Sequence, residues 1–279
     1  MSFDICSRAT VRLELVHDGP VNTRFLVHLD DGARVEAVRY RGDTLCLSTQ
    51  VGCAVGCPFC ASGANGLGRP LSAAELHFQV EAAEAAGGRL ERLTLSGVGE
   101  PLHAHRATRP FIEWARQRGL PTSLTTSGGP IERLREWLHA PHNGLTISCH
   151  AGTERTRARL VPRGPSLAAL FEALEDELPR MTNKRKKKTA LAYLVLAGEN
   201  DSDLEVDAFV KRAAPLGFRV HLYGYNPVPT SSHRGPDAPS FDRIEARVRA
   251  TGVRVVRSSR ARRRPNGGCG TLLALRRPR

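Results

Sequence analysis

Residues 46–60 read Cys46-Leu-Ser-Thr-Gln-Val-Gly-Cys53-Ala-Val-Gly-Cys57-Pro-Phe-Cys60, and four of the seven cysteines of the chain fall in this stretch. Cys53, Cys57 and Cys60 have the spacing C-x3-C-x2-C, which allows three thiolates to converge from one loop. Iron–sulfur clusters are held by Cys thiolates, normally four of them. Three ligands from one loop would leave one iron open to an exchangeable molecule.

Two other interpretations of this loop are less favoured by the sequence. A zinc site needs a fourth protein ligand, and the next His or Cys after Cys60 is His77, inside a helical pattern. Free cysteines are also often buried apolar residues. Gly52, Gly56 and Pro58, however, break up any helix or strand through the stretch. The sequence therefore favours a cluster.

The amino-acid composition indicates which partners and which cellular compartment to expect. The 41 Lys and Arg against 28 Asp and Glu give a net charge of +13, which favours a polyanionic partner over a merely solvated basic surface. No apolar run approaches the roughly 18 residues of a membrane span, so we expect no membrane contact. The first residues show no signal-peptide pattern, and clustered thiols need a reducing compartment. We expect a cytoplasmic protein.

From residue 44, strand patterns alternate with helical patterns. The expected strands are 44–51, 91–97, 121–126, 144–149, 189–196 and 218–225, and the expected helices are 71–87, 104–118, 130–139, 166–178, 202–214 and 239–250. Mostly apolar strands separated by helices indicate parallel strands covered by helices. We therefore predict an α/β fold with a partial (β/α)6, TIM-like barrel whose site gathers at the carboxyl ends of the strands.

The first forty residues follow another pattern. Segments 11–16, 23–29 and 34–38 alternate apolar and polar residues and predict three short strands. We thus expect a small N-terminal β-strand extension at 1–43, the barrel at 44–258 and a tail at 259–279 that carries Cys269. The basic run at 184–188 is typical of a solvated loop, with phosphate contact as the alternative.

The motifs resemble those of a known family. With Phe59 before its last cysteine, the C-x3-C-x2-C loop resembles the signature of the radical S-adenosylmethionine (SAM) superfamily, and residues 44–63 resemble more narrowly the RlmN/Cfr family of RNA adenine methyltransferases. Further similar strings occur in family order within residues 22–275: V-E-A-V at 35–38, G-E-P at 99–101, L-T-T-S-G at 124–128, S-C-H-A at 148–151, Y-N-P-V-P at 225–229 and C-G-T-L at 269–272.

The resemblance implies a radical SAM barrel with defined site residues. Cys53, Cys57 and Cys60 would hold a [4Fe-4S] cluster, and SAM would be bound by Gly99, Glu100, Thr125, Ser148, Cys149, His150 and Asn226. Cys149 stands where the family has Leu, which suits a buried apolar residue better than a fifth ligand. His150 is by type more often a satisfied core histidine than an acid or base. Glu100 offers a carboxylate to the SAM ammonium group.

The resemblance also implies a reaction. Cys269 would receive a methyl group from one SAM, and a radical from a second SAM would remove hydrogen from that methyl group. The resulting methylene radical would add to the adenine ring. Cys46 would then attack the sulfur of Cys269 and leave a disulfide, while Glu36 would handle a proton. Two cysteines beyond the cluster set are what such a pair requires.

The function we expect is methylation of an adenine ring carbon in RNA, with C2 favoured over C8 and 23S rRNA over tRNA. The alternatives are a similar enzyme acting on tRNA or a non-RNA substrate, and a non-catalytic iron–sulfur RNA-binding protein. The expected partners are RNA and an electron donor such as flavodoxin or ferredoxin, and we expect a monomer. We expect a short form that lacks most of the family's N-terminal domain, for which the basic runs at 184–188 and 260–264 could partly compensate.

Overall fold

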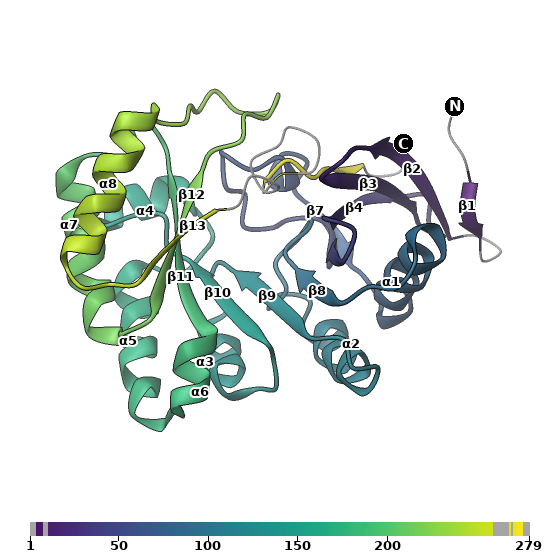
Figure 1. Ribbon diagram of the computed structural model, residues 1–279, viewed down its shortest axis with the longest axis horizontal. Coiled ribbons are helices and arrows are strands. Elements are labelled where there is room, and N and C mark those ends of the chain that lie inside the picture. Colours follow the sequence, from purple (N-terminus) through teal and green to yellow (C-terminus); the bar gives the residue numbers. More distant parts are fainter. Residues whose placement is uncertain (1–3, 8–10, 259–267, 269, 276–279) are drawn as a thin grey trace.

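The computed structural model describes residues 4–7, 11–258, 268 and 270–275 (Figure 1). Its main sheet has the strand order β1-β2-β3-β4-β5-β8-β9-β10-β11-β12-β13, with β14 beside β4. The antiparallel part comprises β1 (Asp4–Ser7), β2 (Arg12–Asp18), β3 (Asn22–His28), β4 (Arg34–Tyr40) and β14 (Ala274–Leu275). The parallel part comprises β5 (Thr44–Leu47), β8 (Arg92–Leu95), β9 (Thr122–Thr126), β10 (Gly144–Ser148), β11 (Thr189–Val195), β12 (Arg219–Gly224) and β13 (Val255–Arg257).

Helices follow the parallel strands along the chain, as expected for an α/β barrel. They are α1 (Ala73–Gly87), α2 (His105–Gln117), α3 (Ile131–His139), α4 (Glu154–Leu160), α5 (Leu167–Glu177), α6 (Asn183–Lys188), α7 (Asp203–Ala213) and α8 (Ala238–Ala250). Figure 1 shows the arc of strands from β8 to β13 with α1 and α2 near one end and α7 and α8 near the other. Within the described residues, β5 and β13 do not pair, so the arc stays open. The prediction of a partial α/β barrel is confirmed.

The parallel strands have two unlike faces. In β10, Leu145 and Ile147 are fully buried in the hydrophobic core, while Gly144, Thr146 and Ser148 between them are only partly buried. The strands β9 and β12 alternate in the same way. Because successive side chains point to opposite sides of a strand, the apolar face packs under the helices and the polar face lines the inside of the arc. The inside is therefore polar along β9, β10 and β12, where we expected mostly apolar strands, whereas β11 is largely apolar as expected and lines the inside with Ala190, Ala192 and Leu194.

The N-terminal strands continue the barrel sheet. Strand β4 pairs antiparallel with β5, placing Val38 opposite Cys46, so the sheet runs without a break through residues 43 and 44. The end of the chain returns to the same place, because Ala274 of β14 pairs with Val35 (Figure 1). The last described strand thus lies beside β4, next to the first barrel strand, whereas β1 lies at the far edge of the same sheet.

The basic run at 184–188 forms most of a short helix, α6, and the expectation of a loop is wrong there. The helix forms because the Thr182 hydroxyl accepts a hydrogen bond from the backbone N–H of Arg185 (3.3 Å), and the Arg185 side chain donates to the His142 carbonyl (3.1 Å). Among the described helices, none is long and apolar enough to span a bilayer.

Candidate functional site

A cavity lies at the carboxyl ends of the parallel strands, where the sequence predicts the site. We call it the front cavity. It is lined by residues from the cysteine loop, the ends of β8 to β12 and the tail, among them Cys53, Cys57, Phe59, Cys60, Ser96, Gly99, Glu100, Thr125, Thr126, Ser127, Ser148, His150, Val161, Leu194, Tyr223, Tyr225 and Gly270. Eight of the twelve predicted site residues within the described chain therefore line one cavity, and Glu36, Cys46, Cys149 and Asn226 do not.

The cysteine loop is held in one conformation by close contacts. Gly52 has φ 82°, and a Cβ there would lie 1.8 Å from the Gly66 carbonyl oxygen, so only glycine fits. The backbone N–H of Cys53 donates to that same oxygen (3.2 Å), and the Arg163 guanidinium donates to the Ala54 carbonyl (2.7 Å). The three thiols consequently face the cavity from a fixed loop.

Burial changes the acidity of these thiols. It raises the pKa of Cys53 to about 12 and that of Cys57 well above its ordinary value. Both side chains pack beside the apolar cluster of Val55, Phe59 and Val161. A buried thiolate needs nearby positive charge, and a metal supplies it when it displaces the proton. The loop thus favours thiolates only with a metal bound.

The three thiols line one cavity without converging on a single point. Among the described residues, no group of three His, Cys, Asp or Glu side chains is close enough to hold one metal ion. In an iron–sulfur cluster each Cys binds a different iron, so cluster ligands stand further apart than the ligands of a single ion.

The carboxylate of Glu100 is the most strongly fixed charge in the front cavity. Its Oε2 accepts hydrogen bonds from the backbone N–H and the hydroxyl of Ser127 (2.6 and 2.8 Å). Its Oε1 accepts from the Thr126 hydroxyl (2.6 Å) and the backbone N–H of Leu102 (3.1 Å). The side chain is almost wholly buried. Four donors hold an anion whose natural partner in the cavity is a cation such as an ammonium group.

His150 faces the cavity as a neutral ring. Its Nδ1 accepts a hydrogen bond from the backbone N–H of Leu194 (3.0 Å), so the proton of the neutral ring lies on Nε2. Burial lowers its pKa from the ordinary 6.5 to about 3. The residue has φ 57°, a left-handed conformation that costs energy outside glycine. His150 therefore offers a hydrogen-bond donor rather than a charge.

Two side chains in or behind the wall of the front cavity were missed by sequence reasoning. The hydroxyl of Tyr225 is buried without a partner and belongs to a residue that lines the front cavity. Arg157 is 1% exposed and donates to the carbonyls of Ser148 (2.6 Å), Cys149 (2.9 Å) and Ser127 (2.8 Å), which ties the ends of β9 and β10 together. Tyr225 directly precedes Asn226, which was predicted as a site residue, so its position in the sequence could have identified it. Nothing in the sequence around Arg157 distinguishes it from other arginines.

Cys46 and the tail approach the front cavity from the side of β5. The Cys46 sulfur lies 3.2 Å from the Ser96 hydroxyl, and Ser96 lines the cavity. Cys269 lies outside the described residues. The residue after it, Gly270, lines the cavity, and its carbonyl accepts a hydrogen bond from the N–H of Ala61 (2.9 Å). The tail is thus attached to the cysteine loop immediately beyond Cys269.

Glu36 lies in β4 beside this tail. Its Oε2 accepts a hydrogen bond from the N–H of Leu273 (2.9 Å), and its Oε1 is 3.5 Å from the Arg24 guanidinium. Burial raises its pKa, with these two contacts acting in the opposite direction. A carboxyl group with a raised pKa can hold or release a proton more readily near neutral pH.

Two predicted contact residues lie off the lining of the front cavity. Cys149 is fully buried, its sulfur 3.8 Å from the Ile147 carbonyl oxygen, and burial raises its pKa to about 12. Asn226 is also buried and borders a neighbouring cavity with Gly235 and Phe241. Both residues are near the site in sequence, but neither side chain is part of its wall.

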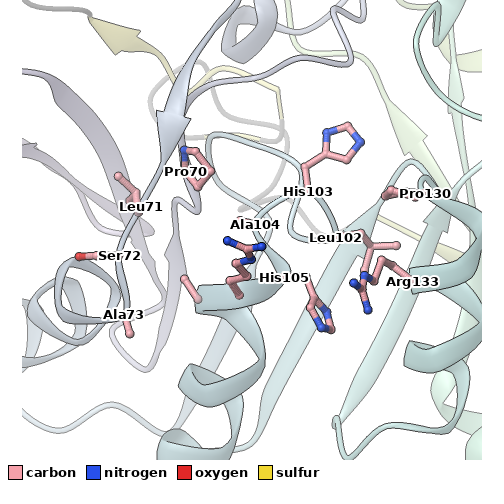
Figure 2. Close-up of a pocket in the computed structure, with 12 residues that line it drawn as sticks. Pro70, Leu71, Ser72, Ala73, Leu102, His103, Ala104, His105, Pro130 and Arg133 are labelled. Carbon is pink, nitrogen blue, oxygen red and sulfur yellow. The ribbon is translucent and has the colours of Figure 1, made fainter.

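A larger cavity, of about 640 Å³, lies beside this rim and contains none of the cysteines. Figure 2 shows it between Pro70–Ala73, the start of α2 at Ala104 and His105, and Pro130 with Arg133 on α3. Its wall is largely apolar, and Arg133 is paired with Glu136 (2.7 Å). The chemistry of the site therefore lies in the smaller cavity.

Comparisons with known proteins agree with this geometry. The model of the radical SAM superfamily matches residues 47–210. A probable RNA methyltransferase of Rhodopseudomonas palustris is 38% identical over 221 residues, covering 75% of this chain and 60% of that protein. A probable RNA methyltransferase of Bordetella avium is 31% identical (94% of this chain, 75% of that protein), and the dual-specificity RNA methyltransferase RlmN of Syntrophotalea carbinolica is 30% identical (93% and 72%).

A solved structure gives the same result. The crystal structure of a radical SAM methyltransferase from Sphaerobacter thermophilus is similar with a TM-score of 0.80 at 28% sequence identity. The similarity covers 93% of this chain and 81% of that one.

The low pKa of His150 predicts how stability depends on pH. Because the folded-state value (about 3) lies below the ordinary 6.5, the unfolded chain binds the extra proton first, and stability falls as pH drops from 6.5 toward 3. The substitution His150→Asn, which tolerates the left-handed backbone, should flatten this dependence by up to about 1.4 kcal/mol per pH unit. Urea unfolding between pH 7 and 5 measures it. His233→Asn, outside the cavity, should keep the wild-type slope, and an unchanged slope in His150→Asn would contradict the assignment.

Proposed function

Because this chain belongs to the radical SAM superfamily and, within it, to the RNA methyltransferases related to RlmN, we propose that it methylates a ring carbon of adenine in RNA. We favour C2 over C8 as the carbon and 23S rRNA over tRNA as the substrate. The observation that carries the proposal is the front cavity, which brings the three loop cysteines, the fixed Glu100 carboxylate and the neighbour of Cys269 together.

The cofactors of the superfamily are a [4Fe-4S] cluster and SAM, and this chain uses them. The residues present fit both groups. Cys53, Cys57 and Cys60 would hold three irons and leave the fourth for SAM. The unpartnered Tyr225 hydroxyl and the Nε2–H of His150 offer further polar contacts in the same cavity.

The amino group of SAM would bind the carboxylate of Glu100. That carboxylate cannot turn away, because Ser127 and Thr126 hold both of its oxygens. Thr125, Ser148 and Gly99 line the same wall and would contact the rest of the cofactor. Cys149 and Asn226 would act from behind this wall rather than by contact with SAM, since their side chains are buried outside the lining.

Together the bound cluster and SAM supply a one-electron route to a carbon radical that can remove hydrogen from a methyl group. Cys269 would carry that methyl group, since its thiolate can displace methyl from a sulfonium centre. Cys46 would then release the methylated RNA by attacking the Cys269 sulfur, and the disulfide formed would need reduction. The position of Cys46 beside Ser96 supports this role.

Glu36 would move a proton in this sequence. Its raised pKa and its hydrogen bond to Leu273 of the tail support the role, because they place a proton-holding group next to the segment that follows Cys269. The reductant of the cluster would be a small electron-transfer protein such as flavodoxin or ferredoxin. A reducing compartment such as the cytoplasm would keep the thiols free for this chemistry.

The cluster assignment predicts that substitutions of Cys60 and Cys149 have different effects on the iron content of the protein. Cys60→Ala removes a proposed iron ligand, so the anaerobically reconstituted protein should lose most of its iron and sulfide. Cys149→Ala removes a buried thiol outside the lining of the cavity and should keep the wild-type iron content. Iron and sulfide analysis measures both. Equal iron content in the two variants would mean that the loop does not hold the cluster.

The reaction itself is tested by nucleoside mass spectrometry. We expect the reconstituted protein, given SAM and a reductant, to form a carbon-methylated adenosine in 23S rRNA transcripts, with tRNA transcripts tested in parallel. Cys269→Ala should abolish the product and leave the iron content unchanged, because Cys269 is assigned to methyl transfer and not to the cluster. The wild-type peptide containing Cys269 should carry a methyl group. Unchanged methylation by Cys269→Ala would overturn the mechanism.

A further inference from the structure

A further cavity, of about 440 Å³, lies inside the arc at the amino ends of the parallel strands. We call it the back cavity. Arg92 and Arg219 begin β8 and β12, Lys188 ends α6 just before β11, and Arg41 and Arg257 complete the wall. The two ends of the barrel thus differ in chemistry, because thiols line the front cavity and cationic side chains line the back cavity.

The positive charge of the back cavity is not balanced by acidic groups in its wall. No Asp or Glu is among the described residues that line it. Arg257 pairs with Asp242 (2.7 Å) and Glu245 (3.4 Å). Among the described residues, the Arg219 side chain donates to the Lys187 carbonyl, which carries no charge, and has no carboxylate partner. Burial, followed by the charges of Lys184 and Arg185, lowers the pKa of Lys188. Cations gathered in this way raise the free energy of the empty cavity, and a bound anion would lower it.

Several arginines on the outer surface of the described chain differ from those of the back cavity because they have carboxylate partners. On the outer surface, Arg243 pairs with Asp203, and Arg247 pairs with Asp207. Arg135 pairs with Asp176 (2.7 Å). The back cavity instead leaves Arg41, Arg92 and Lys188 without a carboxylate partner among the described residues. A concave surface focuses such a field and attracts anions into it.

The remaining wall suits an anion with several oxygens. Thr94, Ser123 and Thr146 carry hydroxyl groups on the polar faces of β8, β9 and β10. The Thr94 hydroxyl is bonded to that of Ser96 (3.0 Å) and the Ser123 hydroxyl donates weakly to the Leu93 carbonyl (3.4 Å), so an anion would compete with these two bonds. The hydroxyl of Ser258, also in the wall, is buried without a partner. Guanidinium groups match the geometry of phosphate, and hydroxyl groups add donors to its other oxygens. The chemistry of the cavity is therefore that of a phosphate site.

The back cavity adjoins the front cavity, because Thr125 and Tyr223 line both. Along β10, Gly144 borders the back cavity and Ser148 the front one. Four residues of strand span about 13 Å, which corresponds to about four stacked-base steps of a nucleic acid strand. A phosphate at the back and a base at the front could therefore belong to one RNA strand.

We propose that the back cavity binds a backbone phosphate of the RNA substrate within a few nucleotides of the base that is modified. This inference rests on the proposed function for the identity of the polyanion. The RNA backbone would thus be bound at the amino ends of the barrel strands, on the opposite side from the cluster loop.

The test compares two pairs of substitutions that remove the same charge. Arg41→Gln with Arg92→Gln alters exposed side chains of the back cavity, and Arg243→Gln with Arg247→Gln alters one exposed and one half-buried side chain of α8. Filter binding of a 23S rRNA transcript is measured from low to high KCl. We expect the back-cavity pair to weaken RNA binding by at least about tenfold and to reduce its salt slope by about 0.7–0.9 for each phosphate that is no longer neutralised. The α8 pair should stay within about twofold of wild type. Equal weakening by the two pairs would overturn the inference.

Two further measurements keep the result interpretable. Iron content and the thermal midpoint verify that each variant is folded. If the variant with Arg41→Gln and Arg92→Gln is not folded, Lys188→Gln replaces it and should also weaken RNA binding. Inorganic pyrophosphate is tested as a competitor: displacement of RNA from wild type supports the phosphate site. Pyrophosphate that raises the thermal midpoint of wild type but never displaces RNA would overturn the RNA assignment. Binding is measured without methylation, so failure to form methyladenosine counts against the proposed function alone.

Discussion

The alternation of side chains along the parallel strands is the constraint on which the rest of the molecule depends. Parallel strands in a closed α/β protein are usually buried on both faces and apolar throughout. Here Leu145 and Ile147 face the helices, while Thr146 and Ser148 face the inside of the arc. One strand thereby supplies core packing with one set of residues and polar groups with the other. The open arc can hold ligands because its inner face needs no apolar filling.

The electrostatics of the front cavity follow from burial within this arrangement. Burial keeps the free thiols and the His150 ring neutral, which leaves Glu100 as the fixed anion of the wall. A cationic ligand and a metal cluster therefore complete the cavity rather than disturb it. Arg157 stabilises the same region from behind, because its guanidinium satisfies carbonyl groups at the ends of two neighbouring strands. The cost of burying that cation is offset by charge-assisted hydrogen bonds.

Much of this could be predicted from sequence, for reasons that are visible in particular residues. The spacing of the loop cysteines and the Gly-Glu-Pro turn encode local geometry, and the rule that sites gather at strand ends gives their meeting point. What was missed depends on tertiary contacts. The helix α6 depends on a cap and a contact with His142, and the return of β14 to β4 depends on pairing between residues far apart in the chain. Whether Cys149 faces the cavity depends on strand alternation, which sets it behind the wall.

The pairing of β14 with β4 also explains how a tail residue can be positioned for chemistry. The segment that follows Cys269 is tied at two places: Gly270 to the cysteine loop at Ala61, and Leu273 to Glu36 of β4. The Ser62 hydroxyl adds a third contact to the Leu272 carbonyl (2.9 Å). These bonds join the tail to the loop and to the strand next to Cys46. The bond from the Leu273 N–H to Glu36 favours the ionised carboxylate, so it lowers the pKa of Glu36 against the effect of burial. The protonation of Glu36 and the binding of the tail to β4 are therefore coupled.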